Sequence, residues 1–237
     1  LLLGAFIGLV DDIAQIRGAL DQISHRYKKI AVVIFLGALI GAWFYFKLGV
    51  QSIAIPFTGN EFSLGLLFIP FFIVVLLAVF SGSVIDGMDG LAGGVLAIIF
   101  ASYSIIAFEK NLIDIAAFSG VISGGILAFL WFNIPPARFY MGENGILGLL
   151  VVLTVIAFLT DTVLLLPIIA LPLAATTASN IIQITSYKYF GKRRVFKIAP
   201  LHHHFHALGW PREKVVMRYW VVSVICAVVG VVVALIS

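Results

Sequence analysis

The sequence predicts an all-α fold: a polytopic transmembrane helical bundle with catalytic loops on the cytoplasmic face. The first reason is composition, because 62% of the 237 residues are hydrophobic, 11% are charged and the mean hydropathy is +1.15. Soluble domains are roughly half apolar and about a quarter charged. The second reason is the length of the apolar runs, and the third is the one-sided placement of Lys and Arg.

Seven apolar runs approach the roughly 20 residues with which a helix crosses a hydrocarbon core. They cover residues 30–46, 63–79, 90–107, 115–132, 146–159, 162–184 and 215–236. A shorter run at 1–10 is predicted to be the last turns of a further helix. Neither the basic segment nor the cleavage site of a signal peptide flanks it.

Alternating these spans across the membrane places thirteen basic residues on one side and only Lys47 and Lys110 on the other. Cytoplasmic loops carry the excess of Lys and Arg, so the first side is predicted to be cytoplasmic. Its basic residues are Arg17, Arg26, Lys28, Lys29, Arg138, Lys188, Lys192, Arg193, Arg194, Lys197, Arg212, Lys214 and Arg218.

The remaining polar residues narrow the class of protein. All five histidines fall on the cytoplasmic side, and no chain of ionisable residues crosses the membrane. An ion pump or coupled transporter would need such residues near the bilayer centre. The one cysteine, Cys226, lies in the last span, which leaves no disulfide framework and no cysteine metal cluster. Residues 51–62 predict a small extracytoplasmic hairpin, and residues 1–237 are predicted to form a single membrane domain.

Two groups of carboxylates are candidates for chemistry. Asp11 and Asp12 lie where the first apolar run ends, and such a pair can hold a divalent ion or act as a base toward a phosphate oxygen. The alternative is that they simply end a helix in water. Asp86 and Asp89 lie in the glycine-rich segment 81–94 and would share one face if it is helical. A helix-packing seam would explain its glycines but not its carboxylates, so a functional role is favoured.

Two further cytoplasmic loops carry candidate residues. In the loop 133–145, Glu143 follows a segment stiffened by two prolines, although a simple turn would look the same. In the loop 186–218, four histidines lie among basic residues. Adjacent histidines cannot all face one metal ion unless the backbone bends, and no cysteine completes a zinc set. Binding of a pyrophosphate is therefore favoured, and contact of the cations with anionic lipid heads is the alternative.

Taken together, four segments resemble the polyprenyl-phosphate N-acetylhexosamine-1-phosphate transferase family. They are Asp11-Asp12, DGMDGLA at 86–92, FLWFN through PA to MG at 129–142, and APLHHHF with GWP and VVMR at 199–218. Their order and spacing agree over essentially the whole chain. The three consecutive histidines and the Gly-Trp-Pro after them favour the peptidoglycan branch over the N-acetylglucosamine branch.

The resemblance implies a ten-helix fold, of which this chain would supply about eight helices, with N-terminal helices missing. It implies transfer of phospho-MurNAc-pentapeptide from UDP-MurNAc-pentapeptide to undecaprenyl phosphate, giving lipid I and UMP, at the cytoplasmic face of the inner membrane. The implied cofactor is Mg²⁺. The implied partners are a UDP-sugar donor, a polyprenyl-phosphate acceptor, the membrane and a second copy of the chain; no nucleic acid is expected.

On this basis the site residues receive roles. Asp11 would deprotonate or orient the lipid phosphate with support from Asp12, and Asp86 and Asp89 would position the nucleotide or the metal. Glu143 is the predicted Mg²⁺ ligand. A covalent aspartyl-phosphate route stays open beside direct attack. The predicted substrate-binding residues are His202, His203, His204, Lys28 and Asn133.

The chain departs from the family pattern beside this predicted site. Glu143 stands where the family carries Asp, which moves the carboxylate by one methylene, and Ile146 stands where it carries Ser. Ser83 takes the place of an Asn, Gln15 of a Lys and His206 of a Glu. These departures keep two alternatives open: a sister transferase that uses UDP-GlcNAc, and a non-catalytic lipid-binding scaffold.

Overall fold

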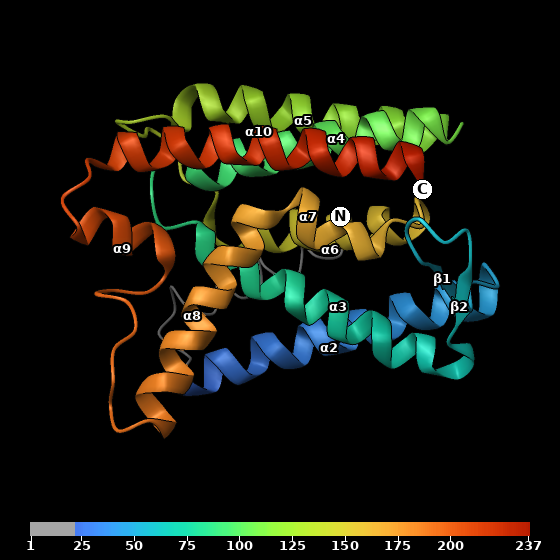
Figure 1. Ribbon diagram of the computed structural model, residues 1–237, viewed down its shortest axis with the longest axis horizontal. Coiled ribbons are helices and arrows are strands. Elements are labelled where there is room, and N and C mark those ends of the chain that lie inside the picture. Colours follow the sequence, from blue (N-terminus) through green and yellow to red (C-terminus); the bar gives the residue numbers. More distant parts are fainter. Residues whose placement is uncertain (1–21) are drawn as a thin grey trace. The chain divides into compact units, whose positions relative to one another are not determined.

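The computed structural model describes residues 22–237, apart from the side chains of residues 22–26, 143 and 144. Apart from one small hairpin, the regular elements of the described chain are all helices, which confirms the predicted all-α class (Figure 1). It divides into two compact units. Unit 1 contains the described chain up to Ser83 together with Met141–Val163, and unit 2 contains Val84–Tyr140 and Leu164–Ser237. Each unit is described by itself.

Five of the predicted spans form helices that are long and apolar enough to cross a membrane. The run at 146–159 forms a shorter apolar helix, Gly145–Leu159. The protein is therefore a multi-pass membrane protein, as its composition predicts. The five long helical spans are Tyr27–Lys47, Gly65–Ile85, Leu91–Glu109, Ile113–Asn133 and Arg212–Ile236.

The predicted span over 162–184 forms two helical pieces that are apolar and long enough only when taken together. The chain forms Val163–Ile169, which ends in α7 (Leu166–Ile169), and then α8 (Leu171–Tyr189), and the two pieces are bent by 85°. Pro172 at the start of α8 has no N–H to donate to the carbonyl four residues earlier, so the regular hydrogen-bond pattern of the helix is interrupted there. As a result α8 takes a new direction and runs on past the predicted end.

Unit 1 contains α2 (Gln22–Lys47), α3 (Phe68–Phe80) and α6 (Gly142–Leu159), and α3 contacts both of the others. The 3₁₀ turns Gly65–Leu67 and Ser81–Ile85 flank α3, and a third covers Val163–Leu165. Gly41 of α2 lets its backbone approach α3, because a Cβ there would lie 3.2 Å from the Cβ of Phe72. Small residues at such contacts are how membrane helices pack closely.

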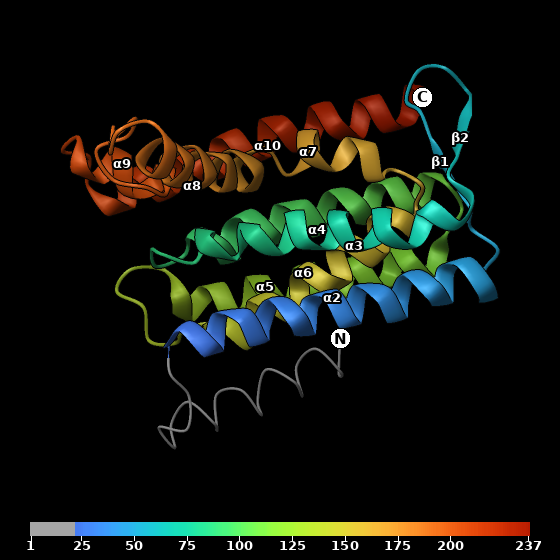
Figure 2. The same ribbon diagram turned by 90° about the horizontal axis from the view of Figure 1, so that it is seen from below.

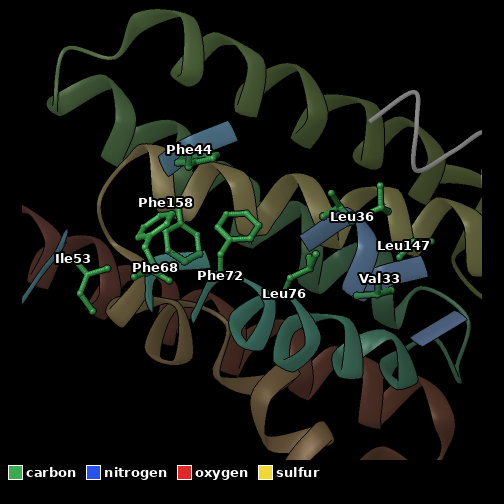
Figure 3. Close-up of a cluster of buried hydrophobic side chains, with 11 residues drawn as sticks. Val33, Leu36, Phe44, Ile53, Phe68, Phe72, Leu76, Leu147 and Phe158 are labelled. Atoms are coloured by element: carbon green, nitrogen blue, oxygen red, sulfur yellow. The ribbon is translucent and has the colours of Figure 1, made fainter. Parts of the chain in front are cut away.

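Four phenylalanines form the centre of unit 1. Phe44, Phe68, Phe72 and Phe158 are all buried, and Figure 3 shows their rings gathered between α2, α3 and α6. The ring centroids of Phe72 and Phe158 lie 4.5 Å apart, and those of Phe68 and Phe158 lie 5.4 Å apart. Such ring contacts add to the packing energy of the buried area.

The predicted hairpin is present. β1 (Ser52–Ala54) pairs antiparallel with β2 (Glu61–Ser63), with Ile53 opposite Phe62. It stands beyond the ends of α2 and α3 that it connects (Figures 1 and 2). The backbone N–H of Ala54 donates to Asp161 Oδ1 at 3.1 Å, which ties the hairpin to the turn after α6.

Unit 2 is built around α4 (Leu91–Glu109), which contacts α5 (Ile113–Asn133) and α10 (Arg212–Ile236). The other helices of unit 2 are α7, α8 and the short α9 (Leu201–Ala207). Ser123 Oγ of α5 donates to the carbonyl of Ala97 at 2.9 Å. On the α10 side, the indole of Trp220 fills the place where a Cβ on Gly94 would stand. Glycine at 94 therefore allows the close contact of α4 with α10.

Replacing Phe72 by alanine tests the aromatic centre of unit 1. Phe72→Ala leaves a cavity, and we expect a loss of about 3 kcal/mol and a melting temperature about 6 °C lower or more. Phe46, which is 76% exposed, is the matched control, and Phe46→Ala should leave the melting temperature nearly unchanged. Thermal unfolding in detergent measures both. Equal effects of the two variants would contradict the packing described.

Candidate functional site

The loop with Asp86 and Asp89 joins the 3₁₀ turn Ser81–Ile85 to α4. It forms turns, so the two carboxylates do not share a helix face. The loop ends at Gly90, whose φ of 77° favours glycine. The N–H of Gly90 donates to Asn133 Oδ1 at 3.0 Å, and its carbonyl accepts the indole N–H of Trp220 at 3.1 Å. The loop is thus held from α5 and from α10.

Two further hydrogen bonds hold the proline-containing loop after α5. Asn133 Nδ2 donates to the carbonyl of Phe139 at 2.7 Å, and Asp89 Oδ2 accepts the backbone N–H of Ala137 at 3.2 Å. Asn133 is buried, and both ends of its amide are engaged within the protein. Its described role is to join the two loops, and its assignment to substrate binding stays a prediction.

Sequence reasoning missed Trp220 as a contributor to the site. The available signal was an indole in a mostly apolar span, because a buried tryptophan N–H usually needs a hydrogen-bond partner. Which carbonyl would accept it depends on how α10 packs on α4, and that contact has no signature in the sequence.

The histidine loop is brought against the aspartate loop. A Cβ on Gly87 would lie 2.5 Å from Nε2 of His202 and 3.0 Å from Nε2 of His203. The backbone between the two carboxylates therefore lies directly on the imidazole pair. The N-terminus of α9 is fixed in this place by Ser179 of α8, whose Oγ accepts the N–H of Leu201 at 2.9 Å.

His202 is fully buried, and neither ring nitrogen has a hydrogen-bond partner among the described residues. Its ring centroid lies 4.3 Å from that of His203 and 6.4 Å from that of Tyr219. Burial, with a smaller contribution from His203, lowers the pKa of His202 to about 4. The imidazole is therefore neutral at physiological pH.

The other histidines differ in what they contact. Burial, followed by the charges of Arg212 and His206, lowers the pKa of His203. His204 Nδ1 accepts the backbone N–H of Lys197 at 3.1 Å, so this ring holds the preceding loop. His206 Nδ1 lies 2.9 Å from the carbonyl oxygen of Trp210, so Nδ1 carries the proton and donates. Of the four, His202 and His203 are the two that meet the aspartate loop.

The carboxylates of this loop are open to a ligand. Asp86 is exposed, yet partial desolvation by the surrounding protein raises the pKa of its carboxyl above the usual value. Asp89 is half-buried and accepts the Ala137 N–H. Within the described part of the chain, no group of three or more His, Cys, Asp or Glu side chains is placed to hold a metal ion.

The structure does not test the remaining predicted site residues. Asp11 and Asp12 lie outside the described residues. Glu143 follows Gly142 in the first turn of α6 in unit 1, and its side chain is outside the description. Lys28 is exposed near the start of α2 in the same unit. Their predicted roles stay predictions.

The fold and these loops define a class: a multi-pass α-helical membrane protein with aspartate and histidine loops gathered at one end of unit 2. The chain belongs to glycosyl transferase family 4, whose family model matches residues 1–161. This confirms the resemblance seen in the sequence motifs.

Relatives with an assigned activity cover nearly the whole chain. It is similar to the phospho-N-acetylmuramoyl-pentapeptide-transferase of Caldanaerobacter subterraneus subsp. tengcongensis, with 36% identity over 225 residues, 94% of this chain and 71% of the relative. The enzyme of the same name from Borrelia garinii subsp. bavariensis is 36% identical over 95% of this chain and 70% of its own length. That from Latilactobacillus sakei subsp. sakei is 36% identical over 97% and 71%.

The buried His202 predicts a pH dependence of stability. Between its folded pKa of about 4 and the unfolded value of about 6.5, the unfolded chain binds a proton that the folded chain excludes. Stability therefore rises with pH across this window and is lost as pH falls from about 6.5 toward 4.

Melting temperatures between pH 7 and pH 4.5 measure this effect. His202→Gln should flatten the pH dependence, whereas His206→Gln, at the exposed end of α9, should retain it because His202 is still present. A His202→Gln protein with the full wild-type pH dependence would show that this histidine is not buried neutral.

Proposed function

We propose that the protein transfers phospho-MurNAc-pentapeptide from UDP-MurNAc-pentapeptide to undecaprenyl phosphate, forming lipid I and releasing UMP, at the cytoplasmic face of the inner membrane. The observation that carries the proposal is the contact of Gly87 with His202 and His203. It unites the two motifs that distinguish the chain, in a protein whose relatives carry the name of this transferase.

The two substrates of the reaction repel each other because both are anionic. An anionic lipid phosphate must approach an anionic diphosphate, and groups that compensate negative charge in the transition state lower the barrier. His203 is neutral because burial and the Arg212 charge depress its pKa, so it would donate an N–H without adding a full charge. Arg212 itself supplies the cation. We assign both to the diphosphate of the donor.

His202 is proposed to position the groups that contact the substrate. It is buried against the His203 ring and fills the space under Gly87. We assign it to orienting the His203 ring and the Asp86–Gly90 loop. Its ring nitrogens have no partner among the described residues, and a buried polar atom without a partner in a native protein calls for an explanation. A buried water molecule would supply the missing hydrogen bond, because the ring has no exposed surface for a substrate to reach.

The two aspartates of the loop are assigned different roles. Asp89 is engaged with the Ala137 N–H and holds the loop after α5. Asp86 is exposed and is assigned to the nucleotide or to a cation bound with it. Asp11, with Asp12 in support, is assigned to orienting and deprotonating the lipid phosphate, as the motif predicts.

A magnesium ion is part of the proposal. Mg²⁺ is usually held by one or two carboxylates together with substrate phosphates, and an exposed carboxylate with a raised pKa, as at Asp86, fits that use. Glu143 is the ligand predicted from the motif. When bound, the ion would neutralise charge on the diphosphate.

Release of UMP by the full-length protein in detergent tests the function. With Mg²⁺ and undecaprenyl phosphate, we expect UMP from UDP-MurNAc-pentapeptide and none above background from UDP-GlcNAc. Turnover with UDP-GlcNAc alone would identify a sister transferase. No turnover with either donor, in protein that still binds the lipid, would support a non-catalytic scaffold.

The same assay tests Glu143. Glu143→Gln keeps the size of the side chain and removes its charge, so activity should fall about 100-fold or more if the carboxylate binds the metal. Glu109→Gln, at the far end of α4, is the matched control and should keep full activity. Wild-type turnover by Glu143→Gln would remove Glu143 from the metal site.

A further inference from the structure

The second half of α8 leaves the packed part of unit 2. Pro172, Leu173, Thr176 and Ser179 in its first half are buried. Beyond them the apolar residues face outward on successive turns, with Ile181 56% exposed and Ile184 55% exposed. Figure 1 shows this part of α8 running away from α10.

An apolar helix exposed on several faces needs an apolar solvent. A water-exposed helix has a polar face, whereas the outward side chains of α8 include Ile181, Ile182 and Ile184. In a multi-pass membrane protein the available apolar solvent is lipid. We infer that the second half of α8 lies in lipid. Because of the 85° bend before α8, it runs in a different direction from the helix that precedes it.

The end of α8 marks a boundary between apolar and polar surroundings. Tyr187, Tyr189 and Phe190 are exposed in succession, and tyrosines are enriched where a membrane meets water. Cations follow at once, and no Asp or Glu occurs anywhere between Asp161 and Glu213 to neutralise them. We name this segment the basic loop; its cations are Lys188, Lys192, Arg193, Arg194 and Lys197, all exposed.

The basic loop is held in a defined conformation. Gln183 Oε1 accepts the N–H groups of Val195 and Phe196 at 3.1 and 3.0 Å, and its Nε2 donates to the carbonyl of Phe196 at 3.1 Å. Ser186 Oγ donates to the carbonyl of Arg193 at 3.0 Å. These contacts fold the loop back along α8, so its cations lie beside the exposed aromatic residues.

We propose that the second half of α8 and the basic loop form a binding site for anionic phospholipid. The isoleucines lie among acyl chains, the tyrosines lie at the level of the headgroups, and Arg193 and Arg194 bind lipid phosphates. Polybasic segments next to a membrane span attract anionic lipids in this way. The residues of this site are other than those of the Asp86–Gly90 loop and other than His202 and His203.

Quenching by brominated lipids tests the site in the full-length protein. Tyr189→Trp places a reporter at the end of α8, and its added emission is measured in phosphatidylcholine vesicles that contain brominated phosphatidylglycerol or brominated phosphatidylcholine. We expect the concentration that quenches half of this emission to be lower for brominated phosphatidylglycerol than for brominated phosphatidylcholine. The difference should be about fivefold or more, since one cation near an anionic surface contributes about 1 kcal/mol. Equal quenching by both lipids would overturn the proposal.

Charge variants identify the groups that bind. Arg193→Gln with Arg194→Gln should abolish the preference for phosphatidylglycerol. Lys47→Gln with Lys110→Gln removes the same charge elsewhere and should preserve it. Gln183→Leu keeps every cation but releases the loop, and should weaken the preference.

Two results would overturn the assignment of these arginines. One is a lipid preference that persists in the double arginine variant. The other is a raised KM for UDP-MurNAc-pentapeptide with an unchanged lipid preference, which would identify the donor diphosphate as their ligand.

Discussion

The candidate site depends on the hydrogen bonds that hold one residue, Gly90. Its N–H is bound by Asn133 of α5 and its carbonyl by Trp220 of α10. Water cannot replace such partners in the interior of a membrane protein, and an unpaired backbone group there costs several kcal/mol. These two bonds therefore fix the aspartate loop in one position. With Asp89 bound to Ala137, they also fix the loop that follows α5.

The electrostatics of the site follow from this rigid placement. The loop presses Gly87 onto His202 and His203, and burial keeps both imidazoles neutral by lowering each pKa. The charged groups beside them include the Asp89 carboxylate, which is held by the Ala137 N–H, the exposed Asp86 carboxylate and Arg212. A site of this kind presents donors to a diphosphate without burying unpaired cations, which would be costly. It also leaves the Asp86 carboxylate accessible to a cation that arrives with the nucleotide.

Much of the fold could be predicted from the sequence, because lipid imposes a simple rule on length and hydropathy. Five spans and the hairpin at 51–62 follow from apolar runs and turn-forming residues. The bend before α8 could not be read in this way, because a proline is compatible both with the first turn of a new helix and with a kinked span. Only the packing of unit 2 distinguishes the two.

The site was predictable in its residue types and less so in its contacts. Carboxylates and histidines on the loops predicted to be cytoplasmic identify Asp86, His202 and His203 as candidates, and the family resemblance predicts that they act together. The tertiary contacts were not predictable: Asn133 joins two loops, and Trp220 reaches across from α10. Such roles depend on which helix packs where.

A single methyl group tests the central claim, that the aspartate loop and the histidine pair form one site. Gly87 has an ordinary φ, so alanine suits its backbone, but its Cβ would meet both imidazoles. The measurement is UMP release from UDP-MurNAc-pentapeptide by Gly87→Ala, with Gly124→Ala, whose Cβ meets nothing within 4 Å, as the control. We predict a loss of about tenfold or more for Gly87→Ala with a melting temperature lowered by several degrees because of the overpacking, and full activity and an unchanged melting temperature for Gly124→Ala. Full activity of Gly87→Ala would contradict the account.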